Sequence, residues 1–239
     1  MPQFEFDIHT HTIASGHGST ATITDMVKAA SKNGLTMLGL SDHGPSTPGG
    51  GRISYFRSIT CSQRERLGIE MLYGAETSIL NTKGRLDLPN SVLKNLDFAI
   101  ASIHHPAMKP GSVEENTDAY IAAIKNPYIS IIGHCDDTKF PVNYLTIVRA
   151  AMKHHVLLEI NNNSLRPDGY RGDTKFNDLM ILNLCKHFNY PVIFSSDSHG
   201  TKHVGDFTYA LETAKLAGMP AELILNYSKE RFLEFIKKI

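Results

Sequence analysis

Short apolar runs alternate with helical patterns along this chain of 239 residues. Runs of strand length predict strands at residues 4–10, 35–41, 69–74, 97–103, 129–133, 156–160 and 191–195. Helical patterns are expected at residues 24–34, 116–125, 144–154, 178–188, 206–217 and 229–238. Seven strands, each followed by a helix or a long loop, indicate a parallel α/β architecture.

This order of elements fits an open doubly wound sheet and a closed barrel alike, but the polar residues separate the two. Nearly every expected strand has His, Asp, Glu or Asn at its carboxyl end. A doubly wound sheet concentrates its site at one switch point, whereas all strands of a barrel contribute to one mouth. We therefore expect a closed barrel. The length suits a single domain over residues 1–239, and no repeat or low-complexity linker divides it.

Composition narrows the class of partner. Lys plus Arg and Asp plus Glu number 24 each, so the formal net charge is zero. The chain therefore lacks the excess of basic residues that would indicate a nucleic-acid partner. The first residues lack a basic segment followed by an apolar one, and no apolar run reaches membrane-spanning length. The three cysteines lie far apart and form no C-x-x-C pair, so we expect them to be reduced thiols. We expect a cytoplasmic protein with no membrane partner, and the sequence leaves a homo-oligomer open.

Histidine occurs at 12 positions, and imidazole is the commonest metal ligand in proteins. His9 and His11 are two residues apart on the first expected strand, so both rings project from one face. Asp197 and His199 repeat this spacing after the last strand. Further candidates stand at the ends of the intervening strands or in the loop after the first strand: His17, His43, Glu76, His104 and His134. In a barrel all of these ends meet at one mouth.

A structural role competes with metal binding at each of these positions. A lone strand-end histidine such as His43 or His134 is more often a hydrogen-bonded structural residue than a ligand. Seven histidines and two acids at converging ends are different, because burying so many ionisable groups is costly unless a cation compensates them. The set therefore predicts a metal cluster. Histidines at helical ends suit the helix dipole and are given a structural role: His154, His155 and His187. For His203, a loop position and a substrate contact both stay open.

Seven short motifs carry a resemblance to a known family: DIHTHT at residues 7–12, SDHG at 41–44, GAE at 74–76, HHP at 104–106, GH at 133–134, LEINN at 158–162 and SDSH at 196–199. Together they resemble the PHP (polymerase and histidinol phosphatase) family, most of all its small stand-alone YcdX-like phosphatase branch. The resemblance implies a distorted, TIM-like (β/α)7 barrel with a trinuclear site. The three divalent ions would usually be zinc, with manganese or iron in relatives.

The resemblance also implies how the ligands divide among the three ions. It places one ion on His9, His11, Glu76 and Asp197, a second on Glu76, His104 and His134, and a third on His17, His43 and His199. His105 stands where relatives often have an acid, and strand alternation turns only one of His104 and His105 inward, which we expect to be His104. Cys135 follows His134 where proline is expected, near the site but without a ligand role.

The reaction that the resemblance implies is hydrolysis of a phosphomonoester by a hydroxide that bridges two metal ions. Glu76 would bridge the ions, and Asp197 would also serve as general base or proton relay. Asp7, on the same face as His9, is expected to orient an imidazole. The phosphate of a small phosphorylated metabolite would meet Arg171, with weaker substrate-binding candidates near the mouth: His105, Arg166 and Lys175.

Three alternatives stay open at this point. A histidinol-phosphate phosphatase needs similar ligands, and direct assay is what distinguishes it. A DNA-directed phosphodiesterase or exonuclease, as in the PHP domains of polymerases, is disfavoured because the chain has neither a polymerase domain nor a basic stripe. A non-catalytic module that binds metal without turnover would keep the same ligands.

Overall fold

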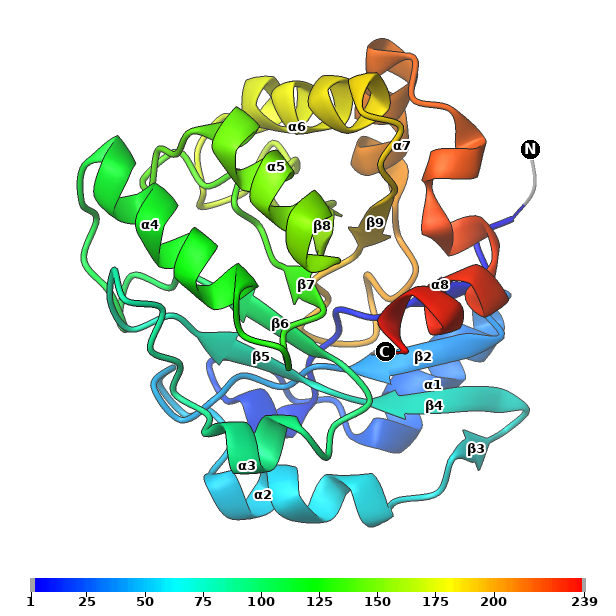
Figure 1. Cartoon of the computed structure of the whole chain (residues 1–239). Coiled ribbons are helices and arrows are strands. Elements are labelled where there is room, and N and C mark those ends of the chain that lie inside the picture. Colours follow the sequence, from blue (N-terminus) through cyan, green and yellow to red (C-terminus); the bar gives the residue numbers. More distant parts are fainter. Residues whose placement is uncertain (1–2, 238–239) are drawn as a thin grey trace.

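Seven parallel strands close into a barrel in the computed structural model, which describes residues 3–237 (Figure 1). Six of them are β1 (Phe6–Asp7), β2 (Met37–Leu40), β6 (Ala99–Ser102), β7 (Ile131–Ile132), β8 (Leu157–Asn161) and β9 (Val192–Ser195). The remaining strand is bent and consists of β4 (Ile69–Tyr73) and β5 (Ala75–Ser78). Two sheets, β1-β2-β4 and β5-β6-β7-β8-β9, are joined at their two seams by parallel bridges between His43 and Glu76 and between Thr10 and Ser198. The expected (β/α)7 barrel is confirmed.

The bend between β4 and β5 lies at Gly74, the last residue of the strand that the sequence predicts. The ring of Phe98 packs so closely here that a Cβ atom on residue 74 would lie 2.6 Å from a ring carbon. Any other residue would therefore displace Phe98 from its buried position. Because of the bend, the first half of the strand pairs with β2 and the second half with β6, which is the distortion of this barrel.

Helices cover the outside of the ring, mostly where the sequence predicts them. The longer ones are α1 (Ile23–Lys32), α4 (Val113–Ile124), α5 (Tyr144–His154), α6 (Lys175–His187), α7 (Thr208–Ala217) and α8 (Lys229–Ile236). A capping box between Thr22 and Asp25 begins α1. Shorter elements were not predicted: α2 (Ile53–Ser58), α3 (Asn90–Leu93), the antiparallel edge strand β3 (Glu65–Arg66) and the 3₁₀ turns at Ile13–Ser15, Ile59–Cys61, Ala221–Leu223 and Leu225–Tyr227. Among residues 3–237, no helix is both long and apolar enough to cross a membrane.

The two ends of the barrel interior differ in chemistry. At the amino ends of the strands, inward-facing apolar side chains form a closed cluster that includes Phe6, Met37, Phe98 and Ile193. Phe232 of α8 joins this cluster, fully buried, with its ring centroid 4.7 Å from that of Phe6, because α8 lies across this end of the barrel (Figure 1). The apolar floor leaves the carboxyl ends of the strands as the place where polar side chains gather.

The side chain of Asn226 closes the seam between the first and last strands. Its Nδ2 donates to the carbonyl oxygens of Phe194 at 2.8 Å and Phe6 at 3.2 Å, and its Oδ1 accepts from the amide of Phe194 at 2.7 Å. Its backbone carbonyl accepts from Glu5 at 2.9 Å. One buried amide thus takes the place of backbone pairing between β1 and β9.

Candidate metal centre

The buried carboxylate of Glu76, on β5, lies at the centre of the barrel mouth. Four imidazole nitrogens surround it: His43 Nδ1 and His134 Nε2 at 2.8 Å, His104 Nε2 at 3.1 Å and His9 Nε2 at 3.2 Å. These rings follow four different strands that are distant in the sequence and converge at the mouth. The structure therefore brings together the strand-end residues that the sequence singles out, because parallel strands direct their carboxyl ends to one side.

A second group of imidazoles lies on the more open side of Glu76. His11 Nε2 is 3.6 Å from its carboxylate. The Nε2 atom of His199 lies 3.3 Å from that of His43 and 3.2 Å from that of His17. Nitrogen atoms from three rings therefore converge within hydrogen-bonding distance, and a cation shared between them would suit this arrangement.

Asp197 completes the mouth from the loop after β9. Its Oδ1 faces His11 Nε2 at 3.2 Å, while its Oδ2 accepts hydrogen bonds from Arg171 at 2.9 Å and from Asn161 Nδ2 at 3.2 Å. Asp197 and His134 both have positive φ angles, of 49° and 25°. Such conformations are unfavourable for residues other than glycine, and they occur where the surrounding structure fixes the direction of a functional side chain.

The ionisation states of Glu76, Asp197, His11 and His43 suit metal coordination. His9 differs, because burial lowers its pKa but the carboxylates of Glu159, Glu76 and Asp197 outweigh burial and hold that pKa well above its usual value. Burial raises the pKa of Glu76, but the neighbouring imidazoles outweigh burial and hold that pKa well below its usual value. Burial is likewise outweighed at Asp197, chiefly by the Arg171 guanidinium, so its pKa is also well below the usual value. Burial lowers the pKa of His43 to about 4 and that of His11 well below its usual value. Ionised carboxylates and neutral imidazoles are the forms that bind metal.

Three buried imidazole nitrogens have no aligned hydrogen-bond partner among the described residues: His9 Nε2, His43 Nδ1 and His134 Nδ1. Two of them, His9 Nε2 and His43 Nδ1, face the Glu76 carboxylate without an aligned hydrogen bond, as nitrogens that share a cation with it would. Within residues 3–237, three overlapping triads place their ligand atoms within 4.8 Å of one another: His9, His11 and Glu76; His43, Glu76 and His104; and His11, His43 and His199. The residues present therefore fit divalent metal ions, and nitrogen and carboxylate donors without a thiolate suit zinc, manganese or iron.

The expected role of Asp7 is wrong, and Glu159 fills it instead. Glu159, on β8, contacts His9 Nδ1 at 2.5 Å, and its other oxygen accepts from the amide of His134 at 2.6 Å. Asp7 instead accepts from the backbone amides of Ser196 at 3.2 Å and Gly205 at 2.9 Å, and so anchors the loop after β9. Periodicity places Asp7 and His9 on one face, but it does not reveal which acid of another strand lies opposite. The LEINN motif was the available signal.

Two neighbouring positions behave as the sequence predicts. His104 points inward, where Nε2 contacts Glu76 and Nδ1 lies 2.9 Å from Ser78 Oγ, while His105 is exposed at the mouth. Cys135 is buried beside the site, and burial raises the pKa of its thiol well above its usual value. Cys135 belongs to none of the groups of ligand atoms that converge among the described residues.

Two cavities flank the cluster, and the substrate-binding candidates differ in which of the two they line. A cavity of about 300 Å³ is lined by cluster histidines and by His105, Lys139, Tyr170 and Arg171. Another, of about 470 Å³, is lined by His17, Asp197 and His199 and by loop residues that include Arg166, Lys202 and His203. Lys175 is exposed at the start of α6 and lines neither cavity. Arg171 and Arg166 are already paired, with Asp197 and Asp168 respectively.

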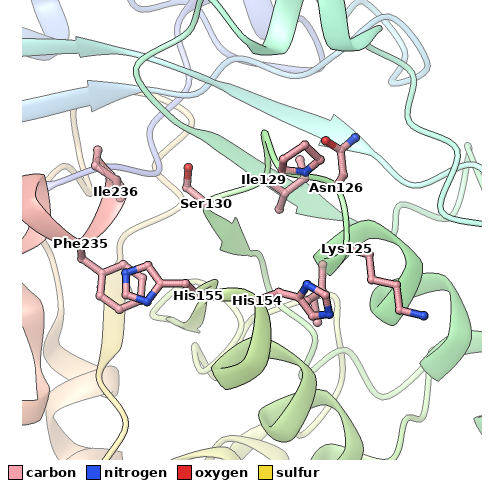
Figure 2. Close-up of a pocket in the computed structure, with 10 residues that line it drawn as sticks. Lys125, Asn126, Ile129, Ser130, His154, His155, Phe235 and Ile236 are labelled. Carbon is pink, nitrogen blue, oxygen red and sulfur yellow. The ribbon is translucent and has the colours of Figure 1, made fainter. Parts of the chain in front are cut away.

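Figure 2 shows a further cavity, of about 280 Å³, at the amino ends of the strands and so away from the cluster. The ring of His155 stacks on Phe235 with centroids 3.8 Å apart, while His154 and Lys125 lie together on the other side (Figure 2). His154 ends α5 and Lys125 follows α4. Positive side chains at helix carboxyl ends interact favourably with the helix dipole, which accounts for them structurally.

The fold and the site define an α/β barrel with a histidine and carboxylate metal centre. The PHP domain model matches residues 7–163, more than half of the chain, and the chain belongs to the PHP domain family. A protein described as a probable phosphatase in Clostridium botulinum (strain Okra) is 42% identical over 231 residues, which cover 97% of this chain and 93% of the relative. A probable phosphatase of Clostridium novyi is 39% identical over 235 residues, covering 98% and 95%.

Solved structures show the same barrel. Histidinol phosphate phosphatase from Lactococcus lactis, in complex with zinc, L-histidinol and phosphate, matches with a TM-score of 0.66 and 20% identity, covering 91% of this chain and 95% of that one. An archaeal ribonuclease P structure matches with a TM-score of 0.60 and 16% identity, covering 98% and 93%. At these identities the likeness shows the fold, and the chemistry must be argued from the site.

Proposed function

We propose that this protein is a metal-dependent phosphatase that hydrolyses small phosphomonoesters at a site of three divalent ions, with zinc as the first candidate and manganese or iron as alternatives. The observation that carries the proposal is the buried carboxylate of Glu76 among four imidazole nitrogens at 2.8–3.2 Å. Relatives described as probable phosphatases, which align over nearly the whole chain, support the same reaction.

The number of donors supports more than one ion. The nine residues that would share the metals are His9, His11, His17, His43, Glu76, His104, His134, Asp197 and His199. A single tetrahedral or octahedral ion uses four to six ligands, whereas nine donors spread over three ions leave open positions for water and substrate. When bound, the ions would supply an acidified water molecule and positive charge for the phosphate oxygens.

The residues of the chain would then position the reactants and move the proton. Asp197 presents Oδ1 toward the cluster because Arg171 and Asn161 hold its Oδ2, so one carboxylate oxygen is fixed where it can orient the attacking water and accept its proton. Glu159 holds the ring of His9 through Nδ1, which fixes the direction of the opposite nitrogen. Arg171, at the edge of the 300 Å³ cavity, is the proposed contact for a phosphate oxygen.

The test measures metal content and turnover in one preparation. We expect more than one transition-metal ion per chain by elemental analysis, together with hydrolysis of p-nitrophenyl phosphate that a chelator abolishes and added zinc or manganese restores. Glu76→Gln should lose metal and activity. Glu212→Gln, an exposed substitution of the same kind on α7, is the matched control and should keep both. One ion or none in active protein would overturn the cluster, and metal without turnover on any phosphomonoester would favour the non-catalytic module.

A further inference from the structure

A row of lysines continues from the metal mouth onto the surface of α1. The 470 Å³ cavity beside Asp197 and His199 shares Thr201 and Lys202 as a common wall with a neighbouring cavity of about 430 Å³. The second cavity is lined on its other side by Lys28 and Lys32 of α1. The side chain of Lys202 therefore borders both cavities, one of which reaches the proposed metal ligands.

The charges of these lysines are only weakly compensated locally. Lys28, Lys32 and Lys202 are exposed, and none has an ion-pair partner in the part of the chain that the structure describes. Three acids line the two cavities, and each has other partners. Asp197 is paired with Arg171, and Asp168 is paired with Arg166. Asp25 accepts from the amide and hydroxyl of Thr22 in the capping box of α1, and Lys28 attracts it more weakly. A chain with no net charge thus has a positively charged band next to its mouth.

The loop that carries Lys202 is held in place relative to the metal centre. Lys202 follows His199 by three residues. Asn33, at the end of α1, donates its Nδ2 to the carbonyl of Val204 at 2.6 Å, and the amide of Gly205 donates to Asp7 Oδ2 at 2.9 Å. On the other side of Lys202, the amide of His11 donates to the carbonyl of Ser198 at 2.8 Å. The backbone is therefore fixed to the barrel before and after Lys202, which keeps this residue beside the cavity.

We propose that the substrate is a small organic phosphomonoester whose leaving group carries a second phosphate, which the band of Lys28, Lys32 and Lys202 binds while the first phosphate lies at the cluster. This inference rests on the proposed phosphatase function. The same band repels a leaving group that carries an amine. The other cavity has a single lysine in its lining, Lys139, which donates to the carbonyl of Tyr170 at 2.7 Å and shares the lining with Asp137.

A matched series of substrates tests the proposal, since its members share a three-carbon chain and carry an uncharged, a positive and a negative group at the far end: propyl phosphate, 3-aminopropyl phosphate and propane-1,3-diol bisphosphate. We expect kcat/KM to rise in the order amine, propyl, bisphosphate, mainly through KM. An exposed ion pair contributes roughly two- to fivefold in binding, so the preference for the bisphosphate should be about tenfold or more when several lysines act together. The preference should shrink as ionic strength rises.

Variants assign the effect to the band. Lys202→Ala and the double variant Lys28→Ala/Lys32→Ala should each lower the ratio of kcat/KM for the bisphosphate to that for propyl phosphate, and Lys202→Glu should shift the preference toward 3-aminopropyl phosphate. Lys215→Ala, an exposed lysine at the end of α7 that borders neither cavity, is the control and should leave the ratio unchanged.

The outcomes separate the inference from the proposed function. Hydrolysis of all three substrates with no bisphosphate preference, or a preference that Lys202→Glu leaves intact, would overturn the inference and keep the phosphatase. An enzyme that prefers the amine would likewise overturn it. If metal-loaded protein hydrolyses none of the three substrates nor p-nitrophenyl phosphate, the proposed function itself fails.

Discussion

The buried ion pair between Arg171 and Asp197 allows a quantitative test of the site. Its atoms are 2.9 Å apart, and the side chains are 3% and 1% exposed. Replacing Arg171 with methionine keeps much of the apolar stem and leaves Oδ2 of Asp197 with one remaining donor, Asn161 at 3.2 Å. Removing one partner of a buried pair typically costs about 3–5 kcal/mol, because the other charge stays buried without compensation. We expect the lower end, about 3 kcal/mol, because Asn161 and the nearby imidazoles still interact with Asp197.

The assay is a double-mutant cycle by urea unfolding at pH 7.5, with and without chelator. Arg171→Met and Asp197→Asn should each lower the free energy of unfolding, and the double variant should lose about 2 kcal/mol less than their sum, because neither unpaired charge remains. Arg57→Met, an exposed change on α2, is the control and should stay within about 0.5 kcal/mol of wild type. A loss below about 1 kcal/mol for Arg171→Met, or an additive cycle, would refute the assigned coupling.

Asp197→Asn and Arg171→Met should differ in which kinetic constant they change, kcat or KM. The amide of Asp197→Asn must face either the cluster or the donors of Arg171 and Asn161 with its NH₂ group, so one set of contacts is lost whichever way it turns. We expect kcat to fall by about 100-fold or more. Arg171→Met should raise KM more than it lowers kcat, since it removes the proposed phosphate contact. Equal effects on kcat in both variants would contradict these roles.

Three further predictions concern the cluster and its supports. His9→Ala and His11→Ala should each lose most p-nitrophenyl phosphatase activity while His154→Ala keeps it; equal losses in all three would mean that the site is misplaced. Glu159→Gln should weaken zinc binding by about 10- to 100-fold in a chelator competition, since the neutral amide holds His9 less firmly; unchanged affinity would exclude this role. Burial raises the pKa of Asp7 from 3.8 to about 6, so the folded state binds the proton more tightly, and this stability is lost as pH rises through about 6. Asp7→Asn should therefore gain stability relative to wild type between pH 4 and 7.5, by about 3 kcal/mol; a pH-independent difference in urea unfolding would contradict it.

The positions of the candidate ligands could be predicted because they follow from topology. Parallel strands share one direction, so any polar residue that ends a strand arrives at the same mouth, as His43 and His134 do on either side of Glu76. Helices with a capping signal, such as α1 after Thr22, were also predictable. The shared direction of the strands was sufficient to predict where the ligands lie, and the local sequence pattern was sufficient to predict the helices.

What the sequence could not provide depends on contacts across the barrel. The partner of His9 Nδ1 is Glu159, which is 150 residues away, and periodicity carries no information on which acid of another strand lies opposite. The lack of space for a side chain at Gly74, where the strand bends, depends on the packing of Phe98 from the following segment. Short elements such as α2 and α3 depend on tertiary packing more than on pattern, because they are too short to show a helical repeat.

The amide of Asn226 has a consequence for the synthesis of the protein. Since it provides the bonds between the first strand and the last, through Phe6 and Phe194, the ring cannot be completed on the ribosome until nearly the entire chain has been made. Until then the nascent chain exposes unpaired strand edges, which makes such intermediates prone to aggregation. His9 and Asp197 lie on opposite sides of that same seam, so the complete set of candidate ligands comes together only once the last strand has been made.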